Sequence, residues 1–323
     1  MNDLRFTVVV PTFRRPDLLQ RCLTALRNQT LPADQFEVIV VDDGNDSDTA
    51  DLVQKDVQRQ GLRITYLGQP HRQGPAAARN RGWRIAQTPL IAFTDDDCIP
   101  QADWLETARK RFEAGASVVT GRVKMPLPDR PTAQDRTTAL LETAEFVTAN
   151  CFCRRTALEQ VGGFDEAFDI AWREDSALQF AFLRAGILIE ACPEAVLVHP
   201  LRASHWYAPL RDERKNQYDA LLYKRYPDLF REHIPRYPGL VTSYYGLVGS
   251  ALLGLGGAVT GNKTSTRLGG LSWAILTASL VARRQANQPI EELPKNALIA
   301  SVSPFLSVYW RLYGAIKHRV WYG

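Results

Sequence analysis

Short β-branched and apolar runs alternate with segments of helical periodicity over the first 123 residues, and this alternation most constrains the fold. Five runs predict strands, at residues 6–10, 37–41, 63–67, 90–94 and 117–120. Strands separated by helices pair in parallel within one sheet and bury that sheet between the helices. The pattern therefore predicts an α/β fold, Rossmann-like, with a mostly parallel sheet flanked by helices.

Proline and glycine positions mark where several helices begin or end. Pro16 is expected at the start of a helix whose apolar face includes Leu19 and Leu23. Pro75, directly after Gly74, is expected to begin another helix. Further along, the pattern predicts a connecting loop at 125–135, helix signals from about residue 138, a helix at 175–185, and strands at 187–190 and 196–199.

Length and composition bound the class of protein. At about 150 residues per domain, 323 residues predict about two domain-sized units. With 45% hydrophobic and 23% charged residues, the composition excludes a mostly disordered or collagen-like chain. A net charge of +4 does not indicate a nucleic-acid partner, and none is expected.

The five cysteines are an odd number in a long chain, which argues against a disulfide framework and favours a reducing compartment. Cys151 and Cys153 could form half of a metal site, but no second Cys/His pair stands at finger-like spacing. We therefore expect them to be buried strand cysteines. The first ten residues lack the pattern of a secretion signal, so the first domain is not expected to be exported.

Charge disappears from two stretches near the C-terminus, 239–262 and 268–282. As helices they would measure about 36 Å and about 22 Å, against a hydrocarbon core of about 30 Å. Basic residues precede the first stretch, and Arg283 and Arg284 follow the second. Residues 237–284 are therefore expected to form a membrane-embedded helical hairpin with both outer ends on the cytoplasmic side. The alternative is a buried or peripheral hairpin of a soluble domain.

The tail, 285–323, interleaves aromatic residues with basic ones, as in Tyr309, Trp310, Arg311 and Lys317. This pattern predicts an amphipathic helix at a membrane interface. The alternative is a helix docked on the catalytic domain.

Three consecutive acids, Asp95, Asp96 and Asp97, follow the predicted strand at 90–94. Ligands of open α/β sheets bind at the carboxyl ends of the strands. Adjacent carboxylates repel one another, and a divalent cation with hard oxygen ligands offsets that repulsion. The alternative is a solvated turn that caps the following helix.

Other predicted strands end in polar residues at the same sheet edge. Pro11 and Thr12 end the first, and Asp42 and Asp43 end the second, before the turn glycine Gly44. The helix expected after Gly74 has an N-terminus that could face an anion. The sequence thus predicts a site for a nucleotide or another anion at this edge.

These motifs occur in an order that resembles the inverting family 2 glycosyltransferases of the GT-A fold. The order is Pro-Thr-Phe, Val-Val-Asp-Asp-Gly, Gly-Pro-Ala-Ala-Ala-Arg-Asn, Asp-Asp-Asp, Gly-Gly-Phe-Asp-Glu and Glu-Asp, across about 7–199. The resemblance implies a GT-A catalytic domain over 1–236, with a nucleotide-binding part at about 1–123 and an acceptor part at about 124–236.

The resemblance also implies roles for particular residues. The nucleotide-sugar site would comprise Pro11, Thr12, Asp42, Asp43, Arg79, Asp95 and Asp96. The metal ligands would be Asp97, Asp95 and His199, and the metal Mn²⁺ or Mg²⁺. Two of these residues could have other roles: Asp43 could be a simple turn acid, and His199 could be a structural, hydrogen-bonded histidine.

Downstream motifs resemble the loop that closes on the donor sugar and leads to the acceptor site. Its residues are Gly162, Gly163, Phe164, Asp165 and Trp172. An ordinary helix C-cap is the alternative for the glycines. The Glu-Asp motif then matches the catalytic base, with Asp175 expected as the base and Glu174 as the fallback. Acids that complement a helix dipole are the alternative there.

The expected function is transfer of a sugar, with inversion, from a nucleoside-diphosphate sugar to an acceptor hydroxyl. The resemblance implies a UDP-sugar, with dTDP and GDP open, and a glycan or lipid-linked acceptor at the cytoplasmic face of the inner membrane, with membrane lipids as partners. A processive polysaccharide synthase is an alternative, but the chain lacks a Gln-x-x-Arg-Trp motif. A sugar nucleotidyltransferase is disfavoured because no Gly-rich phosphate loop follows the first strand. A non-catalytic nucleotide-sugar-binding membrane scaffold stays open.

Overall fold

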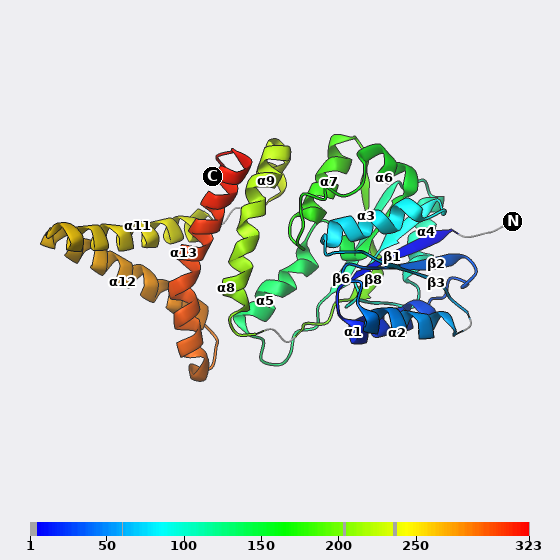
Figure 1. Cartoon of the computed structure of the whole chain (residues 1–323), viewed down its shortest axis with the longest axis horizontal. Coiled ribbons are helices and arrows are strands. Elements are labelled where there is room, and N and C mark those ends of the chain that lie inside the picture. Colours follow the sequence, from blue (N-terminus) through cyan, green and yellow to red (C-terminus); the bar gives the residue numbers. More distant parts are fainter. Residues whose placement is uncertain (1–4, 60, 203–204, 235–237, 323) are drawn as a thin grey trace. The chain divides into compact units, whose positions relative to one another are not determined.

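The fold, traced in Figure 1, comes from a computed structural model that describes residues 5–59, 61–202, 205–234 and 238–322. The chain divides into two compact units. The first comprises residues 1–129 and 138–201, and the second comprises 130–137 and 202–323. The predicted domain boundary at 236/237 lies outside the described residues, and the division into 1–236 and a C-terminal part stays a prediction.

An eight-stranded sheet forms the centre of the first unit, in the order β3-β2-β1-β4-β7-β6-β8-β5. Neighbours among β3, β2, β1 and β4 are parallel, as are β6 and β8, whereas β7 is antiparallel to both its neighbours and β5 is antiparallel to β8. The strands are β1 (Phe6–Thr12), β2 (Phe36–Asp42), β3 (Arg63–Gly68), β4 (Leu90–Phe93), β5 (Ile99–Pro100), β6 (Val118–Lys124), β7 (Cys151–Arg154) and β8 (Ile189–Val198).

Helices cover both faces of this sheet (Figure 1). The helices of the first unit are α1 (Pro16–Arg27), α2 (Ser47–Val57), α3 (Pro75–Ile85), α4 (Trp104–Glu113), α6 (Arg155–Val161) and α7 (Glu174–Arg184), with 3₁₀ turns η1 (Leu140–Thr143) and η2 (Thr148–Asn150). Strand side chains alternate between two cores: Val8 and Val10 pack with α1, α2 and α4, whereas Val9 packs with α3, α6 and α7. This alternation follows from the two-residue period of a strand. Strands buried on both faces explain why the predicted runs are almost continuously apolar.

The predicted helix starts are confirmed at two positions. Pro16 is the first residue of α1 and Pro75 the first residue of α3. Gly74 precedes α3 with a φ of +95°, and a Cβ there would lie 2.3 Å from the Asp169 carbonyl oxygen. Only glycine fits this position, because it needs both a positive φ and the close backbone approach.

The predictions for two segments were wrong. The strands expected at 187–190 and 196–199 form the single strand β8, which pairs with β6 through a bulge between Gly121 and Arg122. Pro193 lacks an N–H for the ladder, and a bulge is where a sheet tolerates such a residue. The expected loop at 125–135 contains the start of α5 (Ala133–Ala139). Thr132 and Asp135 exchange hydrogen bonds that cap this helix, and the sequence reading missed this capping box.

The five cysteines are all free and buried, and Cys151 and Cys153 lie on β7, which confirms the expectation of buried strand cysteines for this pair. Their sulfur atoms are 3.5 Å apart, within one core cluster.

The second unit is helical. Its described elements are α8 (Ala208–Asp212), η3 (Glu213–Asn216), α9 (Gln217–Arg225), α10 (Pro227–His233), α11 (Pro238–Thr260), α12 (Lys263–Gln285), η4 (Ile290–Glu292) and α13 (Leu293–His318). The tail helix α13 packs closely on α9, where a Cβ on Gly314 would lie 2.4 Å from the Gln217 carbonyl oxygen. Lys224 at the end of α9 also donates to the His318 carbonyl oxygen across 2.8 Å.

Helices α11 and α12 form a hairpin that extends from α13 (Figure 1). Glycines allow the two helices to touch along their backbones: a Cβ on Gly269 would lie 2.2 Å from Gly254 N, and one on Gly257 would lie 2.5 Å from Thr266 N. One described helix is long and apolar enough to cross a membrane, the Gly239–Thr260 part of α11, and only 6% of its apolar window is buried.

Candidate active site at the carboxyl edge of the sheet

The carboxyl ends of β1, β2 and β4 bring the predicted polar residues to one edge of the first unit. Thr12 lies opposite Asp42 in the parallel β1–β2 register, and the Asp95–Asp97 segment follows β4, which is the other neighbour of β1. This is the edge at which open α/β sheets bind ligands. The buried acids there include Asp42, Asp43, Asp96 and Asp97.

Asp43 organises the loop that leads into α3. Its Oδ1 accepts hydrogen bonds from Gln73 N at 2.6 Å and from Gln69 Nε2 at 2.8 Å. Its Oδ2 accepts from Gly74 N at 2.8 Å. Asp43 therefore does more than form the turn before Gly44, since it fixes the segment that begins α3.

Asp42 lies behind this edge. Its carboxylate is fully buried and accepts hydrogen bonds from Tyr66 Oη, Gly44 N and Asp46 N, at 2.7–2.9 Å. Asp42 thus supports the turn that presents Asp43. Pro11 is half-buried on β1, in register with Val41.

Asp96 faces β1. Thr12 Oγ1 donates to Asp96 Oδ2 across 2.8 Å, and the exposed Arg15 lies 3.5 Å from Oδ1. Burial raises the pKa of Asp96 to about 6, although Arg15 and Thr12 oppose the shift. Asp96 therefore ties the acidic segment to β1 and titrates near neutral pH.

Asp95 and Glu174 both pair with the guanidinium group of Arg79. Arg79, on α3 and almost fully buried, donates from Nη2 to Asp95 Oδ1 across 2.7 Å, and its Nη1 lies 3.4 Å from Glu174 Oε1. Burial alone lowers the pKa of Arg79, but Asp95, Glu174 and Asp175 outweigh it and raise the pKa above its ordinary value. Burial raises the pKa of Glu174, Asp175 adds to the rise, and Arg79 opposes it. The acidic segment after β4 is thus linked to the start of α7.

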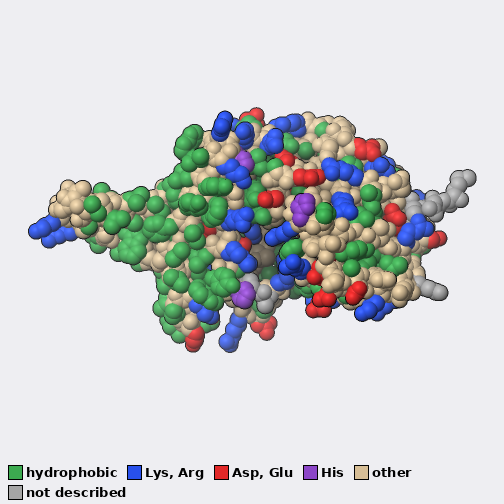
Figure 2. All heavy atoms as spheres, in the orientation of Figure 1, with side chains coloured by type: hydrophobic (Ala, Val, Ile, Leu, Met, Phe, Trp, Pro, Cys, Tyr) green, Lys and Arg blue, Asp and Glu red, His purple; other side chains and the backbone are tan. Residues whose placement is uncertain are grey.

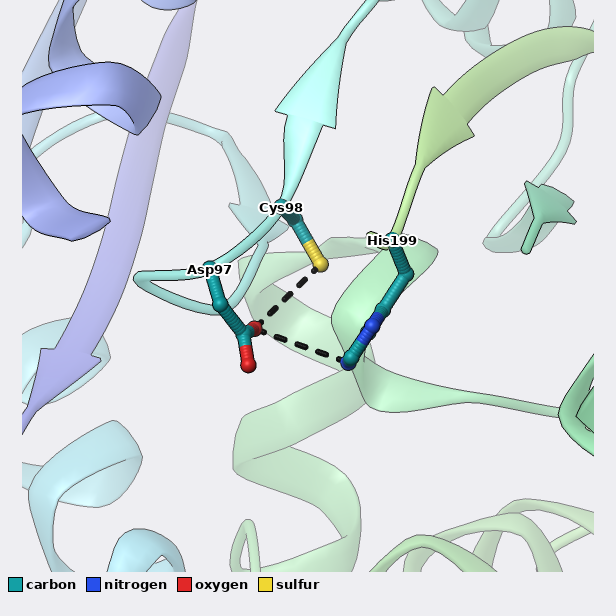
Figure 3. A group of neighbouring side chains, drawn as sticks. All are labelled: Asp97, Cys98 and His199. Atoms are coloured by element: carbon teal, nitrogen blue, oxygen red, sulfur yellow. Dashed lines mark hydrogen bonds and ion pairs between the residues drawn. The ribbon is translucent and has the colours of Figure 1, made fainter. Parts of the chain in front are cut away.

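Of the three expected metal ligands, Asp97 and His199 lie close together, whereas Asp95 is paired with Arg79. Asp97 Oδ1 and His199 Nε2 are 3.5 Å apart, and the Cys98 sulfur lies 3.8 Å from the same oxygen (Figure 3). One donor atom from each residue lies within 4.8 Å of the other two. The ring nitrogen that faces Asp97 is Nε2, and His199 Nδ1 is buried without a hydrogen-bond partner among the described residues. This set of oxygen, nitrogen and sulfur donors fits a divalent cation.

Asp175, the expected base, is held by Thr148 of η2. Thr148 Oγ1 donates to Asp175 Oδ1 across 2.8 Å, and Thr148 N donates to Oδ2 across 3.2 Å. Asp175 is half-buried, whereas Glu174 is almost fully buried and paired with Arg79. Of the two acids, Asp175 is therefore the one with access to solvent.

The Gly162–Asp165 segment is clamped to α3 by Asn80. Asn80 Oδ1 accepts from Phe164 N at 2.9 Å, and Asn80 Nδ2 donates to the Phe164 carbonyl oxygen at 2.9 Å. Gly162 ends α6 with a φ of +79°, and Gly163 has the same φ. A Cβ on Gly163 would lie 2.5 Å from Asn80 Oδ1, so the clamp requires glycine there. Asp165 Oδ1 caps the next turn by accepting from Ala167 N.

Trp172 and Arg173 precede the Glu-Asp motif. Trp172 is 36% exposed, and the Arg173 guanidinium lies 4.9 Å from the centre of its ring. Arg173 has a backbone φ of +70°, a conformation that residues other than glycine rarely adopt. Such strain occurs preferentially at ligand sites.

Sequence reasoning missed three residues of this site: Gln69, Cys98 and Thr148. Gln69 and Thr148 act through partners 26 and 27 residues away, so no local motif marks them. Cys98 directly follows the acidic segment, and its position beside a candidate metal ligand was the available signal.

Comparison with known proteins gives one family model, described as Glycosyl transferase family 2, which matches residues 7–169, about half of the chain. The pre-mycofactocin glycosyltransferase of Mycobacterium tuberculosis is 31% identical over 298 residues, which cover 86% of this chain and 57% of that protein. The chain thus spans little more than half the length of this curated relative.

Two solved structures share the fold. Staphylococcus aureus TarS 1–349 in complex with UDP aligns with a TM-score of 0.54 at 16% identity, covering 99% of this chain and 93% of that one. The mannosyltransferase PcManGT from Pyrobaculum calidifontis, in complex with GDP-Man and Mn²⁺, aligns with a TM-score of 0.56 at 20% identity, covering 98% and 87%. The predicted α/β, GT-A-like fold class is confirmed.

Proposed function

Because the chain belongs to glycosyl transferase family 2, we propose that it transfers a sugar from a nucleoside-diphosphate sugar to an acceptor hydroxyl, with inversion at the anomeric carbon. The observation that carries this proposal is the linkage of the two halves of the site. Arg79 joins Asp95, beside the expected metal ligand Asp97, to Glu174, beside the expected base Asp175. Groups for the leaving diphosphate and for the attacking hydroxyl are thereby held in one constellation.

The nucleotide would bind at the ends of β1 and β2. Pro11 and Thr12 end β1, and Asp43 fixes the Gln73–Gly74 backbone at the start of α3. Asp42 supports the turn from behind. UDP is the expected nucleotide, in keeping with the TarS complex, and the GDP-mannose bound by PcManGT keeps GDP open beside dTDP.

Asp97 and His199 would hold a divalent cation, Mn²⁺ or Mg²⁺, whereas Asp95, the third expected ligand, is paired with Arg79. The fit rests on the 3.5 Å approach of Asp97 Oδ1 to His199 Nε2 and on the oxygen and nitrogen donors that the two residues supply. A cation bound there would neutralise charge on the departing diphosphate. PcManGT, solved with Mn²⁺, shares the fold.

Asp175 would act as the general base. Its carboxylate takes the proton of the acceptor hydroxyl while that oxygen bonds to the anomeric carbon and the bond to the diphosphate breaks on the opposite face. Two hydrogen bonds from Thr148 orient the carboxylate. Glu174 is the weaker choice, because its buried carboxylate is already paired with Arg79.

The Gly162–Asp165 segment and Trp172 would contact the donor sugar and the acceptor. Asn80 fixes the segment, and the partly exposed Trp172 offers a flat apolar face of the kind that stacks on sugar rings.

We place the enzyme at the cytoplasmic face of the inner membrane, with the α11–α12 hairpin in contact with lipid. Hydrophobic side chains lie along much of the hairpin in Figure 2, and those 51–80% exposed include Leu252, Leu253, Leu255, Val259, Leu268, Leu271 and Ile275. An apolar surface of this extent is rare in contact with water. Its lipid neighbours favour a lipid-linked or membrane-bound glycan acceptor.

A donor screen tests the proposed reaction. The full chain in mild detergent, with Mn²⁺ or Mg²⁺, would be offered a panel of nucleotide sugars, and release of nucleoside diphosphate would be measured. Turnover of one donor, lost in Asp97→Ala, is expected. Addition of many sugars to one acceptor would instead indicate a processive synthase, and binding without turnover on any acceptor would indicate a scaffold.

Flotation with lipid vesicles tests the location. The wild-type chain is expected to float, and the double variant Leu252→Glu, Leu255→Glu to lose more than about tenfold in partitioning, because a charge inside a bilayer costs about 2–3 kcal/mol. Leu188→Glu changes an equally exposed leucine of the first unit and is the control. Equal flotation of all three chains would refute the hairpin as the membrane contact.

A further inference from the structure

Three chemically different donors converge beside the acidic segment: a carboxylate oxygen of Asp97, the thiol sulfur of Cys98 and a ring nitrogen of His199. Figure 3 shows the three side chains pointing toward one another from two strand ends. Asp97 and Cys98 are buried, and the His199 side chain is 12% exposed. The family resemblance assigns a role to Asp97 and His199 but none to Cys98.

The backbone dictates this convergence. Cys98 immediately precedes β5 and His199 immediately follows β8, and these strands pair antiparallel with Ile99 opposite Val198. The turn before β5 is closed by Cys98 N, which donates to the Asp95 carbonyl oxygen at 3.1 Å. His199 N is fixed to the Lys124 carbonyl oxygen at 2.8 Å. Two paired strand ends thus hold the three donors in place.

Two of the three donor–donor distances match the edges of a tetrahedral metal site. Ligands at about 2.0–2.3 Å from one ion and at tetrahedral angles lie roughly 3.3–3.7 Å apart. Asp97 Oδ1 lies 3.5 Å from His199 Nε2 and 3.8 Å from Cys98 Sγ. The third pair, Cys98 Sγ and the His199 nitrogen, lies within 4.8 Å, so a cation between the three atoms would draw that pair together by at most about 1 Å.

A sulfur donor changes which cation such a site selects. Carboxylate and water suit Mg²⁺ and Mn²⁺, whereas thiolate and imidazole favour Zn²⁺ and Co²⁺, which also bind more tightly to nearly any such donor set. One oxygen, one nitrogen and one sulfur with a fourth position open make a site for these borderline ions.

We propose that Cys98 is a third protein ligand of the cation held by Asp97 and His199, and that it makes this site bind Zn²⁺ and Co²⁺ in preference to Mg²⁺ and Mn²⁺. On binding, the thiol proton leaves to solvent and the sulfur bonds to the ion. The inference shares Asp97 and His199 with the proposed function, but it concerns ligation and does not require turnover.

Cys98 also belongs to an apolar cluster with Val123, Met125 and Leu197. Replacement of an ordinary core cysteine would leave the electronic spectrum of a bound ion unchanged, whereas replacement of a metal ligand would change it. The spectrum therefore distinguishes a metal ligand from a core cysteine.

The experiment is a Co²⁺ titration of the metal-free full chain in detergent, followed by absorption spectroscopy. Wild type is expected to show a sulfur-to-cobalt charge-transfer band that Zn²⁺ abolishes by competition. Cys98→Ser should lack the band and bind Zn²⁺ at least about tenfold more weakly, with Mn²⁺ affinity changed less than about threefold. Cys22→Ser, at another buried cysteine, is the control and should keep the band.

The outcomes separate this inference from the proposed function. Co²⁺ or Mn²⁺ binding without a sulfur band, a band that persists in Cys98→Ser, or no ion binding at all would overturn the Cys98 assignment. His199→Ala is the second variant, since loss of the band there with Cys98 intact would support the shared site even if Cys98→Ser failed to fold. A sulfur band in a chain that turns over no nucleotide sugar would leave the ligand assignment standing and remove the proposed reaction.

Discussion

Arg79 donates to Asp95 across 2.7 Å from inside the protein, with only 4% of the arginine side chain exposed. The same guanidinium reaches Glu174 at 3.4 Å, so one buried cation balances acids from two distant parts of the chain. A buried ion pair adds little net stability, but removal of one member leaves an uncompensated charge.

Arg79→Met is therefore expected to lower the free energy of unfolding by about 3–5 kcal/mol, because Glu174 and Asp95 lose their countercharge. Arg79→Lys should lower the free energy of unfolding by a smaller amount, because lysine keeps the positive charge but cannot reach both acids with two separate nitrogens. Arg84→Met is the control on the same helix, because Arg84 pairs with Glu166 at the surface and should cost less than about 1 kcal/mol. Denaturant unfolding would measure all three, and equal losses for Arg79→Met and Arg84→Met would contradict the prediction.

Thr148→Val tests how Asp175 is positioned. The substitution removes the hydroxyl that donates to Oδ1 but keeps the backbone donor to Oδ2. A hydrogen bond to a charged group contributes about 1.5–3 kcal/mol, so kcat should fall about 10- to 100-fold with the donor KM nearly unchanged. Thr148→Ser should restore kcat, because it keeps the hydroxyl donor. An unchanged kcat in Thr148→Val would contradict a positioning role for this hydroxyl.

Gly162 and Gly163 form a matched pair for testing the clamp on α3. Both have a φ of +79°, but a Cβ on Gly163 would meet Asn80 and Trp83 within 2.8 Å, whereas one on Gly162 meets nothing within 4 Å. Gly162→Ala should cost about 1 kcal/mol of stability from backbone strain alone. Gly163→Ala should cost about 2 kcal/mol more, from the clash. Thermal unfolding distinguishes the two variants. Similar melting temperatures would mean that Asn80 and Trp83 move aside at little cost in stability.

Asp96 predicts a pH dependence of stability. Burial raises the pKa of this acid from its ordinary 3.8 to about 6, so the folded protein holds the proton more tightly than the unfolded chain. The free energy of unfolding that this tighter proton binding adds is fully present below about pH 4. It is lost as the pH rises through about 6, by about 3 kcal/mol in total.

Asp96→Asn removes that titration. Its free energy of unfolding relative to wild type should therefore rise by about 2–3 kcal/mol between pH 4 and pH 7. Unfolding curves of both chains at the two pH values test this, since the other carboxylates titrate in both and cancel. Parallel pH profiles would contradict the raised pKa.

The positions of site residues could be predicted from the sequence where an acidic motif directly follows a predicted strand. The acids after β2 and β4 lie at the ends of strongly apolar runs, so the strand prediction alone brought Asp43 and Asp97 to one sheet edge. The approach of His199 to Asp97 also agrees with the expected metal ligands, because His199 follows a strand of the same sheet.

What the sequence did not predict depends on contacts between distant residues. Asn80 ends the Gly-Pro-Ala-Ala-Ala-Arg-Asn motif, but the motif gives no sign that its hydrogen bonds go to Phe164, 84 residues away. The continuous strand β8 was hidden by Pro193, since only the pairing with β6 shows that the chain continues through the bulge. Burial separates Asp175 from Glu174, and burial is a property of packing that two adjacent acids do not reveal in sequence.

The most direct test of the central claim is the turnover of Asp175→Asn with the donor found in the screen, measured beside the Kd of the nucleotide. Loss of a general base typically costs about 10²–10⁴ in rate. We predict a loss of that size in kcat with the nucleotide Kd unchanged, because, among the described residues, the hydrogen bonds of Asp175 go to Thr148 and none goes to the residues expected to bind the nucleotide. A variant that keeps near-normal kcat would contradict the assignment of Asp175 as the base of an inverting transfer.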